Sequence, residues 1–403
     1  MKLSSEPVAA LEIGTSNTVI AIGEPLGGGR VKVAAINSIP SSGVRKSQII
    51  DIGQARYSIE SVLRHLADQS DYSIGQAYLA VSGPQIRTKP VNAQTQVVGG
   101  IVHDEDLNVV DARSYESGLA PDRYPIELSQ ISYSLDDIDD ITSPKDMSGH
   151  LLTLHSLCIH GATQCISNAR EAAHQARLEL PDDDVFFAGT CAAAAVLAQQ
   201  DKKDGALVID LGGGSTAYTV WDEGKLVHAG VLGVGGDHVT NDIRVAFGIS
   251  QPQAETLKTT QASAMISESD ASSRVSVPDP TPGFKAATVS RRALNTVVNA
   301  RLQELFSIIR QKMDEENLLH KLNAGIVLTG GGSALPRVAE LAANVFGCGA
   351  RVGSLLPEIE GLEKEPHPAA RAVIAGLLLL AQQQERTSSG LFDSFKNLFG
   401  FSK

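Results

Sequence analysis

The chain has 403 residues, of which 42% are apolar and 20% charged, and its formal net charge is -12 at neutral pH. A chain of this length exceeds what one hydrophobic core usually supports, so we expect two lobes or several subdomains. The negative charge argues against a nucleic-acid partner, because binding nucleic acid requires clustered lysine and arginine. The four cysteines lack the paired spacing of a zinc site and are too few for a disulfide scaffold, which predicts reduced thiols in a cytoplasmic protein.

Neither end of the chain predicts a membrane-spanning segment. Residues 1–10 lack the basic start and apolar run of a signal peptide. The apolar stretch 372–381 is about half as long as the ~20 residues that a spanning helix needs. We therefore expect a buried helix at 372–381.

Short apolar runs that end in glycine-rich turns recur along the chain. The first run, 8–13, ends at Gly14 and resumes at 18–22, which predicts two strands joined by a tight turn. Two hundred residues later, run 206–211 ends in three glycines, and a second strand is expected at 217–221. A third run, at 324–328, leads into three more glycines.

The intervening segments indicate an α/β body. Apolar residues spaced three and four apart predict helices at 52–66, 191–200 and 291–313, and strands that alternate with helices are typical of α/β proteins. Residues 84–161 differ, because they combine short alternating runs with an acidic loop at 136–140. They predict an inserted α+β subdomain.

The glycine turns have the composition of a phosphate site. Such turns leave backbone N–H groups pointing outward, and this arrangement suits a polyphosphate. An acid ends the strand before each of the first two turns, Glu12 before Gly14 and Asp210 before Gly212. Two carboxylates facing each other across a phosphate chain would hold Mg²⁺ largely through its waters.

These turns resemble those of the actin-like and DnaK-like ATPases. Residues 210–216 match that superfamily's second phosphate loop, 330–336 resemble its adenosine motif, and 254–258 resemble its other adenosine segment. The resemblance implies an actin-like fold, with two lobes around a nucleotide cleft, that binds ATP and Mg²⁺. The implied nucleotide-binding residues are Gly14, Thr15, Ser16, Asp210, Gly212, Gly213, Gly214, Ser215, Thr216, Glu255, Lys258, Gly330, Gly331, Gly332 and Ser333, with Glu12 and Asp210 for the metal.

Further segments resemble the FtsA family of bacterial cell-division proteins. They are 42–51, 81–83, 141–152, 231–242 and 291–306, so the resemblance covers nearly the whole chain. It implies a protein that polymerises on the cytoplasmic face of the membrane at the division septum. It also implies that the protein anchors the tubulin-like FtsZ there by the FtsZ C-terminal tail and meets later division proteins.

The resemblance also implies a division into subdomains. The expected parts are IA at 1–83, 162–200 and 361–381, the inserted IC at 84–161, IIA at 201–236 and 301–360, IIB at 237–300, a linker at 382–390 and an amphipathic helix at 391–403.

Three positions depart from the superfamily's pattern. Glu12 stands where the first phosphate loop has Asp, and Asn17 stands where a basic residue is common. Ala188 stands where relatives place a Glu or Gln, and an alanine cannot orient a water for in-line attack. We therefore expect an ATP-binding switch whose hydrolysis is slow or absent.

The C-terminal segment 391–403 has one apolar face at helical spacing. Such a helix could dock on the protein's own body, but the polar linker and the lysines favour a bilayer surface, in whose plane a short amphipathic helix lies. FtsA proteins end in a membrane-targeting helix of this kind. The expected membrane residues are Leu391, Phe392, Phe395, Leu398, Phe399 and Phe401.

The FtsZ tail site is expected in subdomain IIB. The resemblance implies that Arg301 belongs to this site. It gives less support to Arg291 and Arg292, whose charges could instead form a solvated helix face.

Two rival functions use the same fold. One is an assembly platform of the PilM type in pilus machinery, which needs no lipid helix of its own. The other is a small-molecule kinase, which would need an additional carboxylate beside the phosphate loops, and the sequence indicates only Glu12 and Asp210 there.

Overall fold

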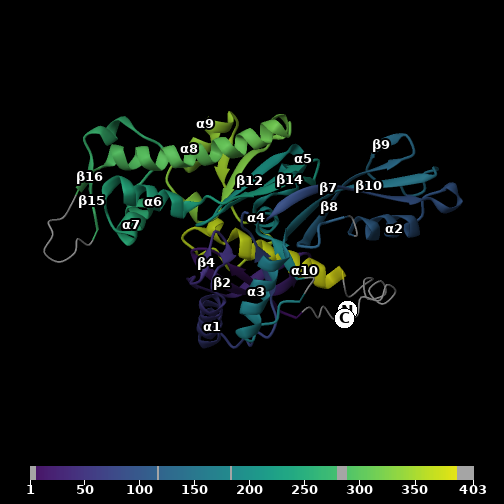
Figure 1. Ribbon diagram of the computed structural model, residues 1–403, viewed down its shortest axis with the longest axis horizontal. Coiled ribbons are helices and arrows are strands. Elements are labelled where there is room, and N and C mark those ends of the chain that lie inside the picture. The colour runs from purple at the N-terminus through teal and green to yellow at the C-terminus, as the bar shows by residue number, and fades with distance from the viewer. Residues whose placement is uncertain (1–5, 116–117, 182–183, 279–287, 388–403) are drawn as a thin grey trace.

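The computed structural model describes residues 6–115, 118–181, 184–278 and 288–387. Figure 1 shows two lobes, one above the other, with a further sheet extending from one side and the α6–α7 region at the opposite end. The two lobes repeat one plan. In each, a central strand pairs antiparallel with the strand that follows it and parallel with a later one.

Lobe I, the lower lobe of Figure 1, is built on a six-stranded sheet in the order β11-β6-β1-β2-β3-β19. Its strands are β1 (Val8–Ile13), β2 (Asn17–Gly27), β3 (Arg30–Pro40), β6 (Tyr78–Val81), β11 (Val185–Phe187) and β19 (Ile359–Glu360). Its helices are α1 (Ile52–Gln69), α3 (Thr163–Gln175), α4 (Ala188–Val196) and α10 (Ala372–Thr387).

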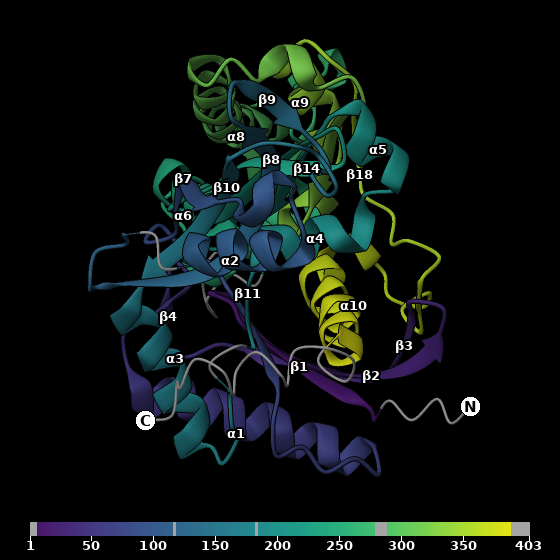
Figure 2. The ribbon, with the colours of Figure 1, turned by 90° about the vertical axis from the view of Figure 1, so that its right-hand side faces the viewer.

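Both faces of this sheet are buried, because successive side chains of a strand point to opposite sides. Ala10 joins the apolar cluster of α4 and α10, whereas its neighbour Leu11 joins that of α1 and α3. The α4–α10 cluster also contains Val208 of the other lobe, so these two helices lie between the two sheets, as Figure 2 shows. One core therefore joins the lobes.

Lobe II is built on a five-stranded sheet in the order β14-β13-β12-β17-β18. Its strands are β12 (Ala206–Leu211), β13 (Thr216–Asp222), β14 (Lys225–Leu232), β17 (Gly325–Thr329) and β18 (Ala350–Val352), with a separate pair β15 (Arg274–Ser276) and β16 (Thr288–Ser290). Its helices are α5 (Gln199–Asp204), α6 (Gly236–Phe247), α7 (Gln251–Gln261), α8 (Arg291–Glu315) and α9 (Val338–Phe346).

The side sheet has the order β7-β10-β8-β9 and its own small core. It consists of β7 (Arg87–Gln96), β8 (Arg123–Leu135), β9 (Ile138–Ile141), β10 (Leu151–Ala162) and α2 (Asp104–Tyr115). It touches lobe II at the edge strand β14, where Thr88 Oγ1 donates to Ala229 O at 3.3 Å and Ser129 Oγ to Leu226 O at 3.2 Å.

Two expected elements differ from those observed, and one predicted boundary falls within a helix. The acidic stretch 136–140 is not a loop throughout, because β9 begins at Ile138 and pairs with β8. The single helix expected at 191–200 is two helices, since α4 ends at Val196 and α5 begins at Gln199. The predicted boundary at residue 300 falls inside the continuous helix α8.

The predicted linker was wrong over residues 382–387. Helix α10 continues to Thr387, and Gln382 is buried. Glutamine, glutamate and arginine are good helix formers, so this polar stretch extends the helix. Residues 388–390 and the amphipathic segment 391–403 lie outside the described residues. No helix within the described ranges combines the length and hydrophobicity needed to cross a membrane.

Candidate functional site

Two carboxylates meet where the lobes join. Glu12 is near the end of β1 and Asp210 near the end of β12, and each lies on the central strand of its sheet. Burial, and then the charge of Asp210, raise the pKa of Glu12 to about 8, although the Arg371 guanidinium acts in the opposite direction. Burial also raises the pKa of Asp210 to about 6, opposed by Thr329 Oγ1, which donates to Asp210 Oδ1 at 3.2 Å. The proton is therefore held more firmly on Glu12.

The first and second glycine turns face each other in close contact. A Cβ on Gly213 would clash with the Ser16 side chain, and one on Gly214 would lie 2.8 Å from Thr15 Cγ2. Only glycine allows this approach of one turn to the other. The structure thus brings together residues that are two hundred positions apart in the sequence.

Backbone N–H groups in these turns are free to bind an anion. Within the described part of the chain, the N–H groups of Thr15 and Ser16 in the first turn and of residues 213–215 in the second donate to no other group. Free N–H groups in a turn form the nest that binds phosphate. The two turns therefore fit a polyphosphate.

The remaining residues of the second turn divide into two kinds. Ser215 Oγ lies 2.9 Å from Ser47 Oγ, so it faces lobe I. Thr216 is fully buried and its hydroxyl donates to Val234 O at 2.8 Å, which supports the turn from behind. Ser47 was not among the residues predicted for this site.

Glu255 and Lys258 of α7 lie behind the second turn. Lys258 Nζ lies 2.7 Å from Glu255 Oε2 and donates to Thr240 Oγ1 at 2.8 Å and to Gly236 O at 3.2 Å. The N–H of Gly236 in turn donates to Gly212 O at 2.9 Å. This network ties α6 and α7 to the second turn.

The third glycine turn packs directly on Asp210. Gly330 has φ +78°, and a Cβ there would lie 2.6 Å from Asp210 Oδ1. Gly332 packs in the same way on Leu211, whereas Gly331 faces open space. The Ser333 hydroxyl is buried and donates to Gly330 O at 2.7 Å, so it stabilises the turn internally.

A cavity of about 750 Å³ lies beside this third turn. Residues 333–337 line one wall, and residues 352–357 and 366–369 line others. Its lining includes Leu335, Pro336 and Leu355, which gives the apolar surface that a purine needs.

A buried carboxylate that the sequence did not indicate lies near these turns. Glu127 of β8 in the side sheet accepts the N–H of Phe187, just before α4, at 2.7 Å. Burial raises its pKa to about 7, opposed by the hydrogen bond from the Phe187 N–H. The charges of Glu127, Glu12 and Asp210 all raise the pKa of the Cys191 thiol, after burial. Only the fold could reveal this neighbour, because β8 belongs to the insertion.

The residues suit Mg²⁺ only together with a nucleotide. Across the described ranges no cluster of three or more His, Cys, Asp or Glu side chains could hold a metal ion. Glu12 and Asp210 supply two carboxylates, so phosphate oxygens and waters would complete an octahedral shell. Bound there, Mg²⁺ would neutralise phosphate charge.

Two of the candidate partner-binding arginines, Arg291 and Arg301, lie apart on α8. Arg291 donates to Gln261 O at 2.7 Å, toward the body of the lobe. Arg301 lies about 15 Å further along α8, at 1.5 Å per residue. It pairs with Asp242 and Glu304, each at 2.6 Å.

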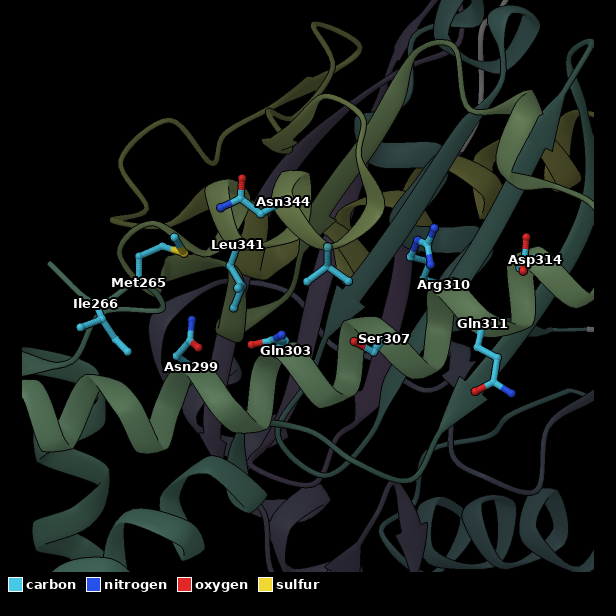
Figure 3. Close-up of a pocket in the computed structure, with 11 residues that line it drawn as sticks. Met265, Ile266, Asn299, Gln303, Ser307, Arg310, Gln311, Asp314, Leu341 and Asn344 are labelled. Carbon is cyan, nitrogen blue, oxygen red and sulfur yellow. The ribbon is translucent and has the colours of Figure 1, made fainter.

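A groove of about 640 Å³ runs along another flank of α8. Figure 3 shows Asn299, Gln303 and Ser307 of α8 facing Leu341 and Asn344 of α9 across it. A helix turns by about 100° per residue, which places Gln303 about half a turn from Arg301. The groove and the Arg301 ion pairs therefore lie on different sides of the helix.

Comparison with known proteins identifies the family. A model described as "Cell division protein FtsA" matches residues 207–373, and one described as "SHS2 domain inserted in FTSA" matches residues 83–160, over the side sheet. The chain is 28% identical over 384 residues to the cell division protein FtsA of Pseudomonas aeruginosa, covering 95% of this chain and 91% of that protein.

Solved structures show the fold. The PilM-PilN type IV pilus biogenesis complex matches with a TM-score of 0.64 at 16% identity, covering 93% of this chain and 98% of that one. MreB5 of Spiroplasma citri bound to ADP matches with a TM-score of 0.54 at 14% identity, covering 96% and 99%. The expected actin-like fold with an inserted subdomain is thereby confirmed. The chain belongs to the FtsA family of cell-division proteins.

Proposed function

We propose that this cell-division protein binds Mg-ATP between the first two glycine turns and uses it as a switch while tethering FtsZ filaments to the membrane. The observation that carries the nucleotide site is the pair of turns, whose free N–H groups face each other beside Glu12 and Asp210. A solved structure of the same fold, MreB5, is bound to ADP, which supports a nucleotide here.

Each group has a role in this proposal. The free N–H groups bind phosphate oxygens, and the two carboxylates hold the waters of Mg²⁺. The third turn receives the adenosine, and Glu255 and Lys258 of α7 are proposed to border its ribose and base. The expected subdomain boundaries remain a prediction, with α8 spanning the proposed IIA and IIB.

Hydrolysis is proposed to be slow or absent. Ala188 is the first residue of α4, and its methyl group cannot orient a water. The Glu127 carboxylate nearby already accepts the Phe187 N–H, so it stabilises the start of the helix. The nucleotide then acts through binding and release.

The membrane tether is assigned to the C-terminal segment 391–403, and the test is liposome co-sedimentation with and without ATP and FtsZ. Replacing Phe395 and Phe399 by Asp places two charges on the apolar face, which costs several kcal/mol of bilayer binding, at about 1.5 to 3 kcal/mol for each apolar side chain. Sedimentation with vesicles should be lost, while ATP binding and the melting temperature stay unchanged.

A matched control adds the same charge to the polar side. Ser394→Asp with Asn397→Asp should retain most vesicle binding, because neither residue belongs to the apolar stripe. If the Phe variant sediments like the unmodified protein, the anchor lies elsewhere. If it loses thermal stability, the helix belongs to the body, and a platform of the PilM type becomes the better account.

The FtsZ tail site is proposed near Arg301, with Arg291 and Arg292 at the start of the same helix. Arg301→Glu should abolish binding of an FtsZ C-terminal peptide, because it would place a third acid beside Asp242 and Glu304. ATP affinity should stay intact, since α8 lies outside the glycine turns. Arg310→Glu, on the groove side of α8, is the matched control. If both variants bind the peptide with equal affinity, the FtsZ tail does not bind at Arg301.

A further inference from the structure

A small hairpin of lobe I reaches the two phosphate turns. Its strands are β4 (Val44–Arg45) and β5 (Gln48–Ile49), and its tip is Lys46-Ser47. Both tip residues have left-handed backbone, with φ of 51° and 56°. Residues with a Cβ atom disfavour this conformation, so the tips of such hairpins usually carry Asn and Gly. Strain of this kind persists where the surrounding structure fixes it, often at a functional site.

The hairpin is anchored at its base. The N–H groups of Ile50 and Asp51 donate to Gly43 O at 2.8 and 3.2 Å, and a side chain on Gly43 would have no room. Asp51 also caps α1, accepting the Gln54 N–H at 3.0 Å. The tip is thus presented from a fixed base on lobe I.

Three hydroxyl groups from three segments converge at the tip. The Ser47 N–H donates to Thr15 Oγ1 at 2.8 Å, and Ser47 Oγ lies 3.5 Å from Thr15 Oγ1 and 2.9 Å from Ser215 Oγ. Ser47 therefore touches the first turn and the second turn at once. This places the tip beside the free N–H groups of both turns.

Lys46 brings a cation to the first two turns. It is exposed, and in the described residues its ammonium makes no ion pair or hydrogen bond. Its side chain reaches toward lobe II, where a Cβ on Gly233 would lie 3.5 Å from Lys46 Cδ. After burial, the Lys46 charge is the largest cause that lowers the pKa of His238.

The other cations near the turns are already paired. Lys258 lies 2.7 Å from Glu255, and Arg371 lies 3.0 Å from Glu365. The first turn supplies no cation, because Asn17 stands at its end. A triphosphate at this site would carry excess negative charge near an unpaired ammonium group.

We propose that Lys46 binds the terminal phosphate of the nucleoside triphosphate, and that Ser47 positions it by contacting both turns. This inference rests on the proposed ATP site. The adenosine is assigned to the third turn on lobe II, so a hairpin from lobe I that meets the first two turns is at the phosphate end. Lysine binds phosphate as a flexible point charge, which suits a hairpin tip.

The test compares ATP and ADP affinity in the full-length protein by calorimetry with Mg²⁺. Lys46→Gln should weaken ATP binding by about tenfold or more, as expected for losing a hydrogen bond to a charged group, and ADP binding much less. Lys46→Arg should restore most of the loss. Arg45→Gln, which removes the neighbouring exposed cation, should leave both affinities unchanged.

The outcomes separate this inference from the proposed function. No loss of ATP affinity in Lys46→Gln, or an equal loss for ADP, overturns the assignment to the terminal phosphate. If the unmodified protein binds neither nucleotide, the ATP site itself fails. Because Lys46 is exposed, melting curves of the variants should match, and a shared affinity loss with a lower melting temperature would also count against a direct contact.

Discussion

The first and second glycine turns share one plan but differ in how they are supported. The second turn is held on several sides. Its Gly212 and Gly213 carbonyls accept N–H groups from α6 at 2.9 and 2.8 Å, and the third turn packs on Asp210. The first turn has one internal hydrogen bond, from Gly14 N–H to Asn17 O at 3.0 Å. Two further hydrogen bonds support it, from Ser41 N–H to Ser16 O at 3.0 Å and from Ser47 N–H of the hairpin to Thr15 Oγ1 at 2.8 Å.

The carboxyl groups that precede the two turns, Asp210 and Glu12, also differ in their surroundings and in their pKa. Asp210 has a hydrogen-bond donor in Thr329 and a pKa raised to about 6, so it is mostly ionised at neutral pH. Glu12 has a pKa raised to about 8 and mostly retains its proton in the free protein. The second turn is therefore held by more of its surroundings than the first, and burial favours the protonated carboxyl more strongly at Glu12 than at Asp210.

Removing the Asp210 carboxylate is expected to have the largest effect on nucleotide binding. Asp210→Asn should weaken Mg-ATP binding about a hundredfold, and Glu12→Gln only about tenfold. Residues that act on a metal through its directly bound ligands typically change metal affinity by about 10- to 100-fold when mutated. Calorimetry at neutral pH measures both. Equal losses would show that the two carboxylates share the metal evenly, contrary to their pKa difference.

Separating the two turns should have the next largest effect. In Gly214→Ala the new methyl group meets Thr15, so the turns must move apart and nucleotide affinity should fall at least about tenfold, because small displacements in a site are costly. Gly75→Ala is the matched control, since nothing lies within 4 Å of its Cβ and it lies outside the three turns. A comparable loss in the control would mean that the contact between the first two turns does not set the affinity.

The smallest expected effect is on the pH dependence of stability without nucleotide. Both carboxyls bind protons more tightly in the folded protein, so their contribution is fully present at low pH and is lost as pH rises through the folded-state pKa, about 8 for Glu12 and about 6 for Asp210. The melting temperature should therefore fall by a few degrees between pH 6 and 8 on account of Glu12.

Two variants check the assignment of that slope. Glu12→Gln should flatten the decline between pH 6 and 8, because it removes the titrating group. Asp210→Asn should mainly affect the range below pH 6. Melting curves at half-unit pH steps distinguish the two, and an unchanged slope in Glu12→Gln would assign it to another buried acid such as Glu127, whose pKa is about 7.

The local spacing of apolar residues predicted the main strands and helices of the two lobes well. The strands of both turns and helices α1 and α8 were confirmed close to their expected bounds, because alternation and three-to-four spacing report directly on which side chains are buried. The errors came where local composition was ambiguous. The polar stretch after Ala381 suggested a linker, yet it continues α10, and the acidic stretch after Leu135 contains a strand.

The sequence by itself determined the fold class, the glycine turns and the acids that precede them, because close approach of backbones requires glycine wherever it occurs. Only the tertiary structure decided which distant groups share that site. Ser47, Lys46 and Glu127 come from a hairpin and an inserted sheet, and nothing in their local sequence indicates that they lie near the turns. Likewise, the difference between Glu12 and Asp210 arises from burial and from neighbours such as Thr329 and Arg371, which folding alone brings together.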